Sequence, residues 1–271
     1  MIIHLSKFDI VAYLTALQLY LPRLLAIFTM VAFFSKSVIS GTMIRIGICL
    51  SILIMLMPDI INDSLVQQSH IKLSAMQLLP IIIKEAFIGL IFGFIISIPF
   101  WILEATGNFI DNQRGGAGAG GSKDQMSGSD STELGQFLLR IIVVLFYVSG
   151  GFLHFVGWVY HSYEIWPVLT YVPTLDINVS YVALEQLDKF FDVVLISCAP
   201  IVICMFISEL GLGLVNRFAP SLNVFIISMP IKSAVGFLVL ILYLPIFINH
   251  YLGKQGEVDQ IFSTIMRVVQ P

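Results

Sequence analysis

Six long apolar stretches follow one another along the chain, with polar segments between them. They cover roughly residues 8–34, 38–58, 77–110, 135–160, 190–215 and 222–249. Each meets or exceeds the ~20 apolar residues that a helix needs to cross the hydrocarbon core of a bilayer. The pattern therefore predicts an all-α integral membrane protein with about six long apolar helices.

Prolines within these stretches indicate that several of the helices are broken. The third stretch would be about 50 Å long as one helix, which exceeds a simple span. We expect Pro80 and Pro99 to break it, because proline removes a backbone donor and clashes with the preceding turn. Further prolines inside the stretches are Pro22, Pro200, Pro230 and Pro245. Broken helices at membrane depth need protein or a water-filled cavity around them, so the pattern indicates a buried partner or a lumen.

The segment Asp111–Glu133 is the main polar interruption of this pattern. Its sequence is DNQRGGAGAGGSKDQMSGSDSTE, and its candidate functional residues are Arg114, Gly115, Gly116, Gly118, Gly120, Gly121 and Lys123. Glycine admits almost any backbone conformation. The segment is therefore either a mobile linker or a loop shaped by what packs around it.

Two further segments have apolar residues near helical spacing. We predict an amphipathic connection at about residues 174–192 and a short surface helix at about 254–270. Together with the apolar stretches they would form a single membrane-embedded domain over residues 1–271.

Composition supports the membrane prediction and excludes some functions. Hydrophobic residues make up 58% of the chain and charged residues 11%, whereas a soluble domain carries about 25% charged residues. The protein must therefore contact membrane lipid. The net charge of −3 is spread thinly, which excludes nucleic-acid binding through a clustered basic face.

Ionisable groups inside the apolar stretches are expensive and are usually paired or functional. Glu85, Gly89 and Gly93 recur at i, i+4 and i+8 and place a GxxxG pattern beside a carboxylate. Such a stripe lets another backbone approach closely. That backbone belongs either to this chain or to another subunit.

A second stripe, Glu209, Gly213 and Arg217, has the same spacing. A turn around Pro220 would fold this helix against the next one as a hairpin. Glu209 lies eleven residues before that proline and Lys232 twelve after it. We therefore predict that the two charges approach each other and fix the register of the hairpin.

No pattern indicates catalysis, a metal or a cofactor. The segment 116–121 satisfies G-x-G-x-x-G, but dinucleotide binding also needs a preceding strand and a following helix in a βαβ unit. His154 and His161 share a helix face without further ligands at metal spacing. Cys49, Cys198 and Cys204 are scattered in apolar runs and favour burial as small apolar residues.

Three blocks resemble the SctT/FliR family, the export-apparatus subunit of type III secretion systems and bacterial flagella. They are YLPRLLAIFTMVAFF at 20–34, EAFIGLIFGFIISIPFWILEATGNFIDNQRG at 85–115 and ELGLGLVNRFAPSLNVFIISMPIKSAVGF at 209–237. The wording ISMPIKS is more similar to the injectisome branch than to the flagellar one. Ser221 stands where many relatives carry Gln, and the glycine-rich loop has fewer apolar residues than flagellar relatives.

The resemblance implies a structural and gating subunit rather than an enzyme. One copy would join several SctR-type and SctS-type subunits, in helical hairpins within a larger helical cone around the pore. The loop at about 107–131 would plug the pore against leakage until an unfolded polypeptide is exported. SctU-type and SctV-type export gate subunits would meet the complex, in the inner membrane and within the basal body.

Two alternatives remain open at this point. A secondary transporter for ions or small solutes would also explain broken helices and the intramembrane Glu85, Glu104, Glu209 and Lys232. A structural membrane subunit without any gating part would explain the same composition.

Overall fold

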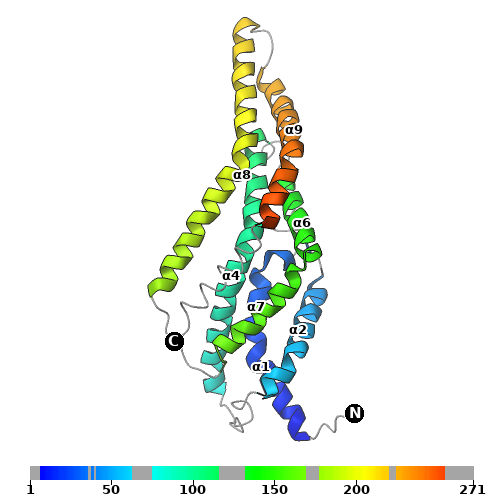
Figure 1. Cartoon of the computed structure of the whole chain (residues 1–271), viewed down its shortest axis with the longest axis vertical. Coiled ribbons are helices and arrows are strands. Elements are labelled where there is room, and N and C mark those ends of the chain that lie inside the picture. Colours follow the sequence, from blue (N-terminus) through cyan, green and yellow to red (C-terminus); the bar gives the residue numbers. More distant parts are fainter. Residues whose placement is uncertain are drawn as a thin grey trace. The chain divides into compact units, whose positions relative to one another are not determined.

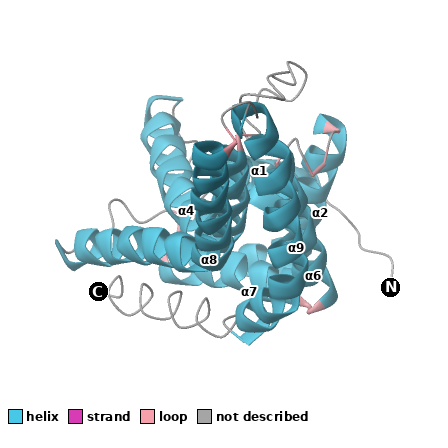
Figure 2. Ribbon diagram, turned by 90° about the horizontal axis from the view of Figure 1, so that it is seen from above, coloured by secondary structure: helices cyan, strands magenta, loops and turns pink. Residues whose placement is uncertain are grey.

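A computed structural model describes residues 7–35, 38–39, 41–62, 75–115, 132–168, 177–219 and 224–253. Within these ranges the backbone is helical apart from short turns and connections, and they contain no strand (Figure 2). The predicted all-α class is confirmed. The predicted surface helix at 254–270 and the central part of the glycine-rich loop, residues 116–131, lie outside the described ranges.

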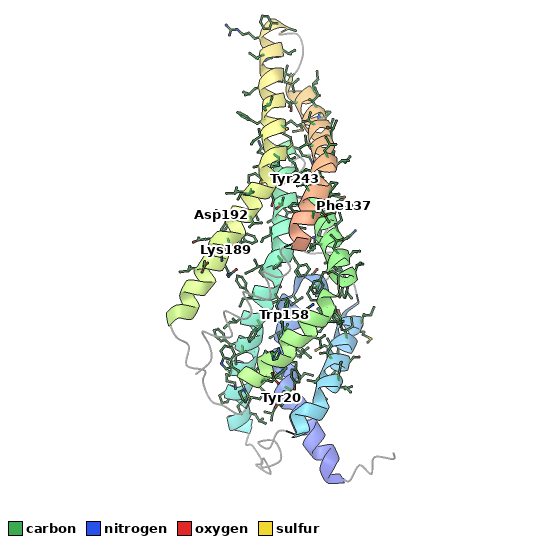
Figure 3. The ribbon with its side chains drawn as sticks, viewed as in Figure 1. Tyr20, Phe137, Trp158, Lys189, Asp192 and Tyr243 are labelled. Atoms are coloured by element: carbon green, nitrogen blue, oxygen red, sulfur yellow. The ribbon has the colours of Figure 1, made fainter. Side chains whose placement is uncertain are left out.

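The described helices follow the apolar pattern, with different boundaries (Figure 1). They are α1 (Lys7–Met30), the 3₁₀ turn η1 (Ala32–Phe34), α2 (Thr42–Asn62), α4 (Ala75–Arg114), α6 (Glu133–Val148), α7 (Gly151–Ile165), α8 (Ile177–Phe218) and α9 (Val224–Gly253). The predicted connection at 174–192 is continuous with the fifth apolar stretch from Ile177 onward, as the first part of α8. Lys189 and Asp192 mark this part of α8 in Figure 3.

Three described helices are long and apolar enough to cross a membrane, over Leu78–Arg114, Leu184–Phe218 and Ile226–Asn249. The bent pair of α6 and α7 makes a fourth if it counts as one span. The apolar parts of α1 and α2 are shorter. The described residues therefore hold three or four candidate spans, fewer than the six predicted.

The expected breaks at Pro80 and Pro99 do not occur, because α4 is helical from Ala75 to Arg114 across both prolines. Proline removes only one backbone hydrogen bond of a helix. In apolar surroundings every other backbone group still needs its intrahelical partner, because water is not there to replace it. A long apolar helix therefore loses less by continuing through a proline than by ending there.

A break occurs instead at a glycine inside the fourth apolar stretch. Gly150 has φ +81°, a left-handed conformation that glycine adopts without steric penalty. The chain turns by 79° between α6 and α7 at this point. Glycine, rather than proline, therefore sets the break here.

The chain divides into two compact units, which are described separately. The first comprises Met1–Ile98, Phe146–Ile177 and Met266–Pro271, and the second comprises Pro99–Leu145 and Asn178–Ile265. The core of the first unit is a cluster of rings from α1, η1, α6 and α7: Phe28, Phe33, Phe34, Phe146 and Phe155, each less than 8% exposed. Phe28 stacks on Phe34 with centroids 4.2 Å apart, and Phe155 meets Phe33 edge-on at 5.2 Å. Aromatic pairs favour such offset and edge-on arrangements.

The GxxxG stripe of α4 packs on α1 inside the first unit. A Cβ on Gly89 would overlap the Arg23 carbonyl oxygen and lie 2.7 Å from the Ala26 Cβ. A Cβ on Gly93 would lie 2.8 Å from the Cβ of Met30. The close approach left open by the sequence is therefore made within this chain.

In the second unit, α8 and α9 form an antiparallel hairpin (Figure 1). Gly236 of α9 packs on Met205 of α8, whose Sδ would lie 3.0 Å from an added Cβ. Much of the hairpin's apolar surface is exposed, including Ile203, Phe206, Ile207, Leu210, Leu214, Ile226, Leu238, Ile241, Leu242 and Ile246. An apolar surface of this kind needs lipid or protein to cover it.

We expect Gly89→Ala to destabilise the folded chain and Gly157→Ala to leave it as stable or more stable. Alanine adds up to about 1 kcal/mol of helix propensity at either site. At Gly89 this gain in stability is opposed by overpacking against α1, which costs about 1–3 kcal/mol. No atom lies within 4 Å of a Cβ at Gly157. Thermal unfolding of the two purified variants in detergent measures the difference, and equal midpoints would refute the packing described for α1 and α4.

Candidate functional site

A fully buried ion pair joins α1 to α4 in the first unit. The Nε of Arg23 donates to Oε2 of Glu85 at 2.7 Å, and neither side chain is exposed to solvent. The other carboxylate oxygen, Oε1, has no hydrogen bond among the described residues but lies 2.9 Å from the Nζ of Lys84. The carboxylate is therefore neutralised by two cations, as a buried charge in an apolar helix requires.

The same two cations also contact the end of α7 and the segment that follows it. Arg23 donates through Nη1 to the Ser162 carbonyl and through Nη2 to the Trp166 carbonyl, the latter at 2.7 Å. The Nζ of Lys84 lies 2.7 Å from the Val168 carbonyl oxygen. Carbonyls at a helix C-terminus lack intrahelical partners and favour nearby cations. These contacts join α1, α4 and α7 to one another.

Two tyrosines make further contacts around Arg23. The Arg23 guanidinium lies 4.4 Å from the ring centroid of Tyr163, a cation–π distance. The Tyr163 hydroxyl donates to the Tyr20 carbonyl at 2.8 Å, and Figure 3 labels Tyr20 on α1. The sequence pattern identified Glu85 but missed Arg23, although a lone arginine inside the first apolar stretch was a usable signal.

A second polar cluster, in the second unit, lies where the glycine-rich loop leaves α4 and returns to α6. Asn108 Oδ1 accepts from the backbone N–H and the hydroxyl of Thr132, at 2.8 and 3.0 Å. Asp111 Oδ2 accepts from the Leu134 N–H at 3.0 Å, and its Oδ1 accepts from Arg114 Nε at 2.6 Å. We call these five residues the loop-base cluster. The first turn of α6 thus receives acceptors from α4 for N–H groups that no helix can satisfy internally.

Close backbone packing lies next to the loop-base cluster. A Cβ added to Gly107 would lie 2.6 Å from the Cα of Gly135, so the two helices touch without side chains between them. One turn away, Gln136 Nε2 donates to Glu104 Oε1 at 3.2 Å. The helices α4 and α6 are therefore joined by both polar and backbone contacts at this level.

Helix α9 also reaches the loop-base cluster. The guanidinium carbon of Arg114 lies 4.9 Å from the ring centroid of Phe237. Gly115 has φ +85°, and an added Cβ would lie 3.3 Å from the terminal methyl of Met229. Both ring and methyl belong to α9, so the end of α4 contacts the hairpin of the same unit.

Of the predicted loop residues, Arg114 and Gly115 are described and take part in these contacts. Gly116, Gly118, Gly120, Gly121 and Lys123 lie outside the described ranges. The sequence pattern missed Asn108 and Asp111 as individual residues, because a single amide or carboxylate beside a polar segment resembles the start of a solvated loop. The helical spacing of Glu104, Asn108 and Asp111 was the available signal.

The predicted approach of Glu209 to Lys232 is confirmed, with Nζ 2.6 Å from Oε1. The lysine side chain is 13% exposed and the glutamate 47%. The rest of the stripe does not pack within the described chain, because a Cβ on Gly213 would meet nothing within 4 Å and Arg217 is exposed. The pair fixes the hairpin register while one of its members faces outward.

Within the described residues, no group of three or more His, Cys, Asp or Glu side chains is placed to hold a metal ion. His161 Nδ1 instead lies 2.6 Å from Glu164 on the exposed surface of α7. The charged side chains gathered in the two units bind other parts of the chain. Their geometry suits holding helices in place.

Comparison with known proteins gives consistent matches along the chain. Residues 14–257 match the family model of bacterial export proteins, family 1. The chain is 36% identical to the Yop proteins translocation protein T of Yersinia pestis over 232 residues, 86% of this chain and 87% of that protein. It is 29% identical to the surface presentation of antigens protein SpaR of Salmonella typhimurium over 237 residues, 87% and 85% of the two chains. The flagellar biosynthetic protein FliR of Bacillus subtilis is 32% identical over 160 residues, 58% and 61% of the two chains.

We expect Glu85→Gln and Arg23→Met each to lower the stability of the folded chain by about 3–5 kcal/mol. The first leaves the buried Arg23 without its carboxylate, and the second leaves Glu85 with Lys84 alone. Combining Arg23→Met with Glu85→Gln should cost less than the two single changes together. A double-mutant cycle on thermal unfolding in detergent measures this coupling. Glu164→Gln is the matched control, since it removes a carboxylate from an exposed pair on α7. Additive effects of the two single changes would contradict the pairing.

Proposed function

The chain belongs to family 1 of the bacterial export proteins, and from this premise we propose that it closes and gates the export pore of a type III secretion system. Its relatives are translocation, secretion and flagellar biosynthesis proteins, so it is an export-apparatus protein and not an enzyme. Its apolar helices make it a multi-pass membrane protein. Relatives from translocation systems cover more of the chain than the flagellar relative does, which favours the injectisome branch.

We place the protein in the bacterial inner membrane, within the basal body. One copy would join SctR-type and SctS-type subunits, and the assembled complex would contact SctU-type and SctV-type gate subunits. The substrates would be unfolded polypeptides. The family resemblance supports these partners.

The observation that carries the subunit proposal is the outward face of the α8–α9 hairpin. Glu209 is 47% exposed there, although it lies on a helix that is otherwise apolar enough to span a membrane. A carboxylate facing lipid is costly, whereas one facing a neighbouring protein finds donors. Gly213, one turn further along the same helix face, leaves open space beside it, since a Cβ there meets no described atom within 4 Å. Small residues of this kind allow a second helix to approach closely.

The comparison of the two glycine stripes strengthens this argument. The stripe Gly89–Gly93 of α4 is filled by α1 of the same chain. The stripe Glu209–Gly213–Arg217 of α8 also has a small residue at its centre, but a Cβ at Gly213 meets no neighbour within the described chain. A helix from another subunit is the occupant that the proposal assigns to it.

The gating part of the proposal concerns the predicted plug loop at about 107–131. Its first part, residues 107–114, is helical as the end of α4, so the loop itself follows Arg114. The family resemblance supports its assignment as the pore plug, and its glycine content would leave few side chains to grip a passing polypeptide. The contacts at the loop-base cluster support a loop that is held at one place, because they join its two described ends.

The alternative of a secondary transporter gains no support from the charged groups that suggested it. Glu85 is sealed between two cations, Glu104 accepts from Gln136, and Glu209 pairs with Lys232. A transporter needs carboxylates that exchange a solute or proton with a water-filled path. These carboxylates hold helices together instead.

We expect native mass spectrometry of the chain, co-expressed with its SctR-type and SctS-type partners, to give one copy of it among several of theirs. Gly213→Leu should abolish this assembly while the chain alone accumulates normally, because the added side chain occupies only the outward face. Gly236→Leu is the matched control, since it meets Met205 within the hairpin and should reduce accumulation of the chain itself. A stable homo-oligomer of the wild-type chain without partners would overturn the proposal and favour a transporter.

Deletion of residues 115–121 should allow ions to leak through the assembled complex, because it shortens the plug. Conductance of purified complexes in planar bilayers measures the leak, and native mass spectrometry checks that composition is unchanged. Replacing 115–121 by a Gly/Ser segment of equal length is the control for loop length and should leak less. An intact complex that stays sealed after the deletion would indicate a structural subunit without a gating part.

A further inference from the structure

We propose that the loop-base cluster is a fixed anchor for the plug, one that stays closed while a polypeptide passes. The inference rests on the proposed function for the identity of the loop, but its evidence is the geometry of the described residues. The residues concerned are Asn108, Asp111 and Arg114 of α4, with Thr132 and Leu134 at the start of α6. They are positioning residues: they hold the two ends of the loop together and do not themselves obstruct the pore.

Asp111 is the first part of the anchor. Its side chain is 2% exposed, and both of its oxygens are used, one by Leu134 N–H of α6 and one by Arg114 Nε of its own helix. A buried carboxylate keeps its charge only with such partners. Separating α4 from α6 would remove an N–H donor from the carboxylate and leave that N–H without an acceptor. The contact therefore opposes opening from both sides.

Asn108 is the second part, and it acts through one oxygen. Oδ1 receives two donors from Thr132, the residue at which the described chain resumes after the loop. The same oxygen packs against Gly135, where an added Cβ would overlap it. The Gly107–Gly135 contact one residue earlier brings the backbones themselves together. No space remains at this level for a small adjustment of one helix against the other.

Helix α9 supplies the third part. Phe237 lies under the Arg114 guanidinium, and Met229 lies against Gly115 at the last described position before the loop. Arg114 thus contacts both Asp111 and α9. The anchor therefore involves three helices of the second unit. None of them can move away from the loop ends without breaking these contacts.

These contacts decide between two ways in which a plug could clear a pore. In the first, α4 and α6 move apart and carry the loop ends with them. In the second, the helix ends stay together and the loop clears the pore from a fixed base. Buried, charge-assisted hydrogen bonds and direct backbone contact favour the second, because movable elements are drawn from weakly packed, solvent-exposed parts of a structure.

A reversible cross-link tests the anchor directly. In Asn108→Cys/Thr132→Cys the two new thiols replace side chains whose oxygens lie 3.0 Å apart. We expect oxidation to join them within the assembled complex and secretion to continue at the rate of the same double variant kept reduced. Oxidation that blocks secretion, with recovery after reduction, would show that the base opens and would overturn the proposal. Each single cysteine variant, oxidised in parallel, controls for reaction with the native thiols.

Substitutions test the positioning role. Asn108→Leu and Asp111→Ala should leak ions at a level comparable to deletion of 115–121, measured per assembled complex in planar bilayers. Asn108→Asp keeps the acceptor oxygen and should restore most of the seal. Thr106→Ala is the matched control, because this residue is also buried on α4 but its hydroxyl bonds only to Ile102 of the same helix. It should leave the seal intact.

The outcomes separate the anchor from the plug. A leak after the 115–121 deletion, with sealed Asn108→Leu and Asp111→Ala complexes, would overturn the anchor and leave the plug standing. If neither the deletion nor the substitutions leak, the proposed gating function fails, and the cross-link still reports whether the base opens. If a substitution prevents assembly, the cross-linked variant decides the matter in its place.

Discussion

The Arg23 guanidinium is the group on which the first unit depends. Its donors serve Glu85 of α4 and two carbonyls at the end of α7, and its face lies against Tyr163. Arg23 is completely buried. Its charged donors cannot bond to water there, so the guanidinium needs each of these protein partners. One side chain thereby makes the positions of three helices depend on one another. Apolar contacts alone would do so less strongly, because lipid tails can replace an apolar neighbour.

Local and pairwise features of the sequence predicted the fold better than contacts between distant segments. The Glu209–Lys232 pair could be predicted because a hairpin turn relates its two positions by simple counting. The partner of Glu85 could not, because Arg23 lies 62 residues away on a helix whose neighbours the sequence does not specify. Similarly, the GxxxG pattern predicted a close approach at Gly89 but left its partner open. The choice of α1 follows from tertiary packing.

The errors in predicting helix breaks have a common physical cause. Pro80 and Pro99 were expected to end a helix, and Gly150 was not expected to do so. Proline removes one backbone hydrogen bond, but in apolar surroundings a helix that ended there would leave more backbone groups without partners. Gly150 interrupts the helix for a different reason, because it takes a left-handed conformation that other residues avoid. In this apolar chain, therefore, the left-handed conformation that glycine permits indicated the helix break better than the hydrogen bond that proline removes.

The polar groups of this protein differ in how completely the chain itself satisfies them. Glu85 and Asp111 are buried and have protein partners for their charge, which suits contacts that persist through a working cycle. Glu209 has one partner and is half exposed on an otherwise apolar hairpin, next to Gly213, which has open space above it. Within an export assembly the first kind of group would hold this subunit in one shape, and the second would be completed only by a neighbouring subunit. A subunit that joined a complex and also kept a loop in register would need both kinds, and in this chain they lie on different helices.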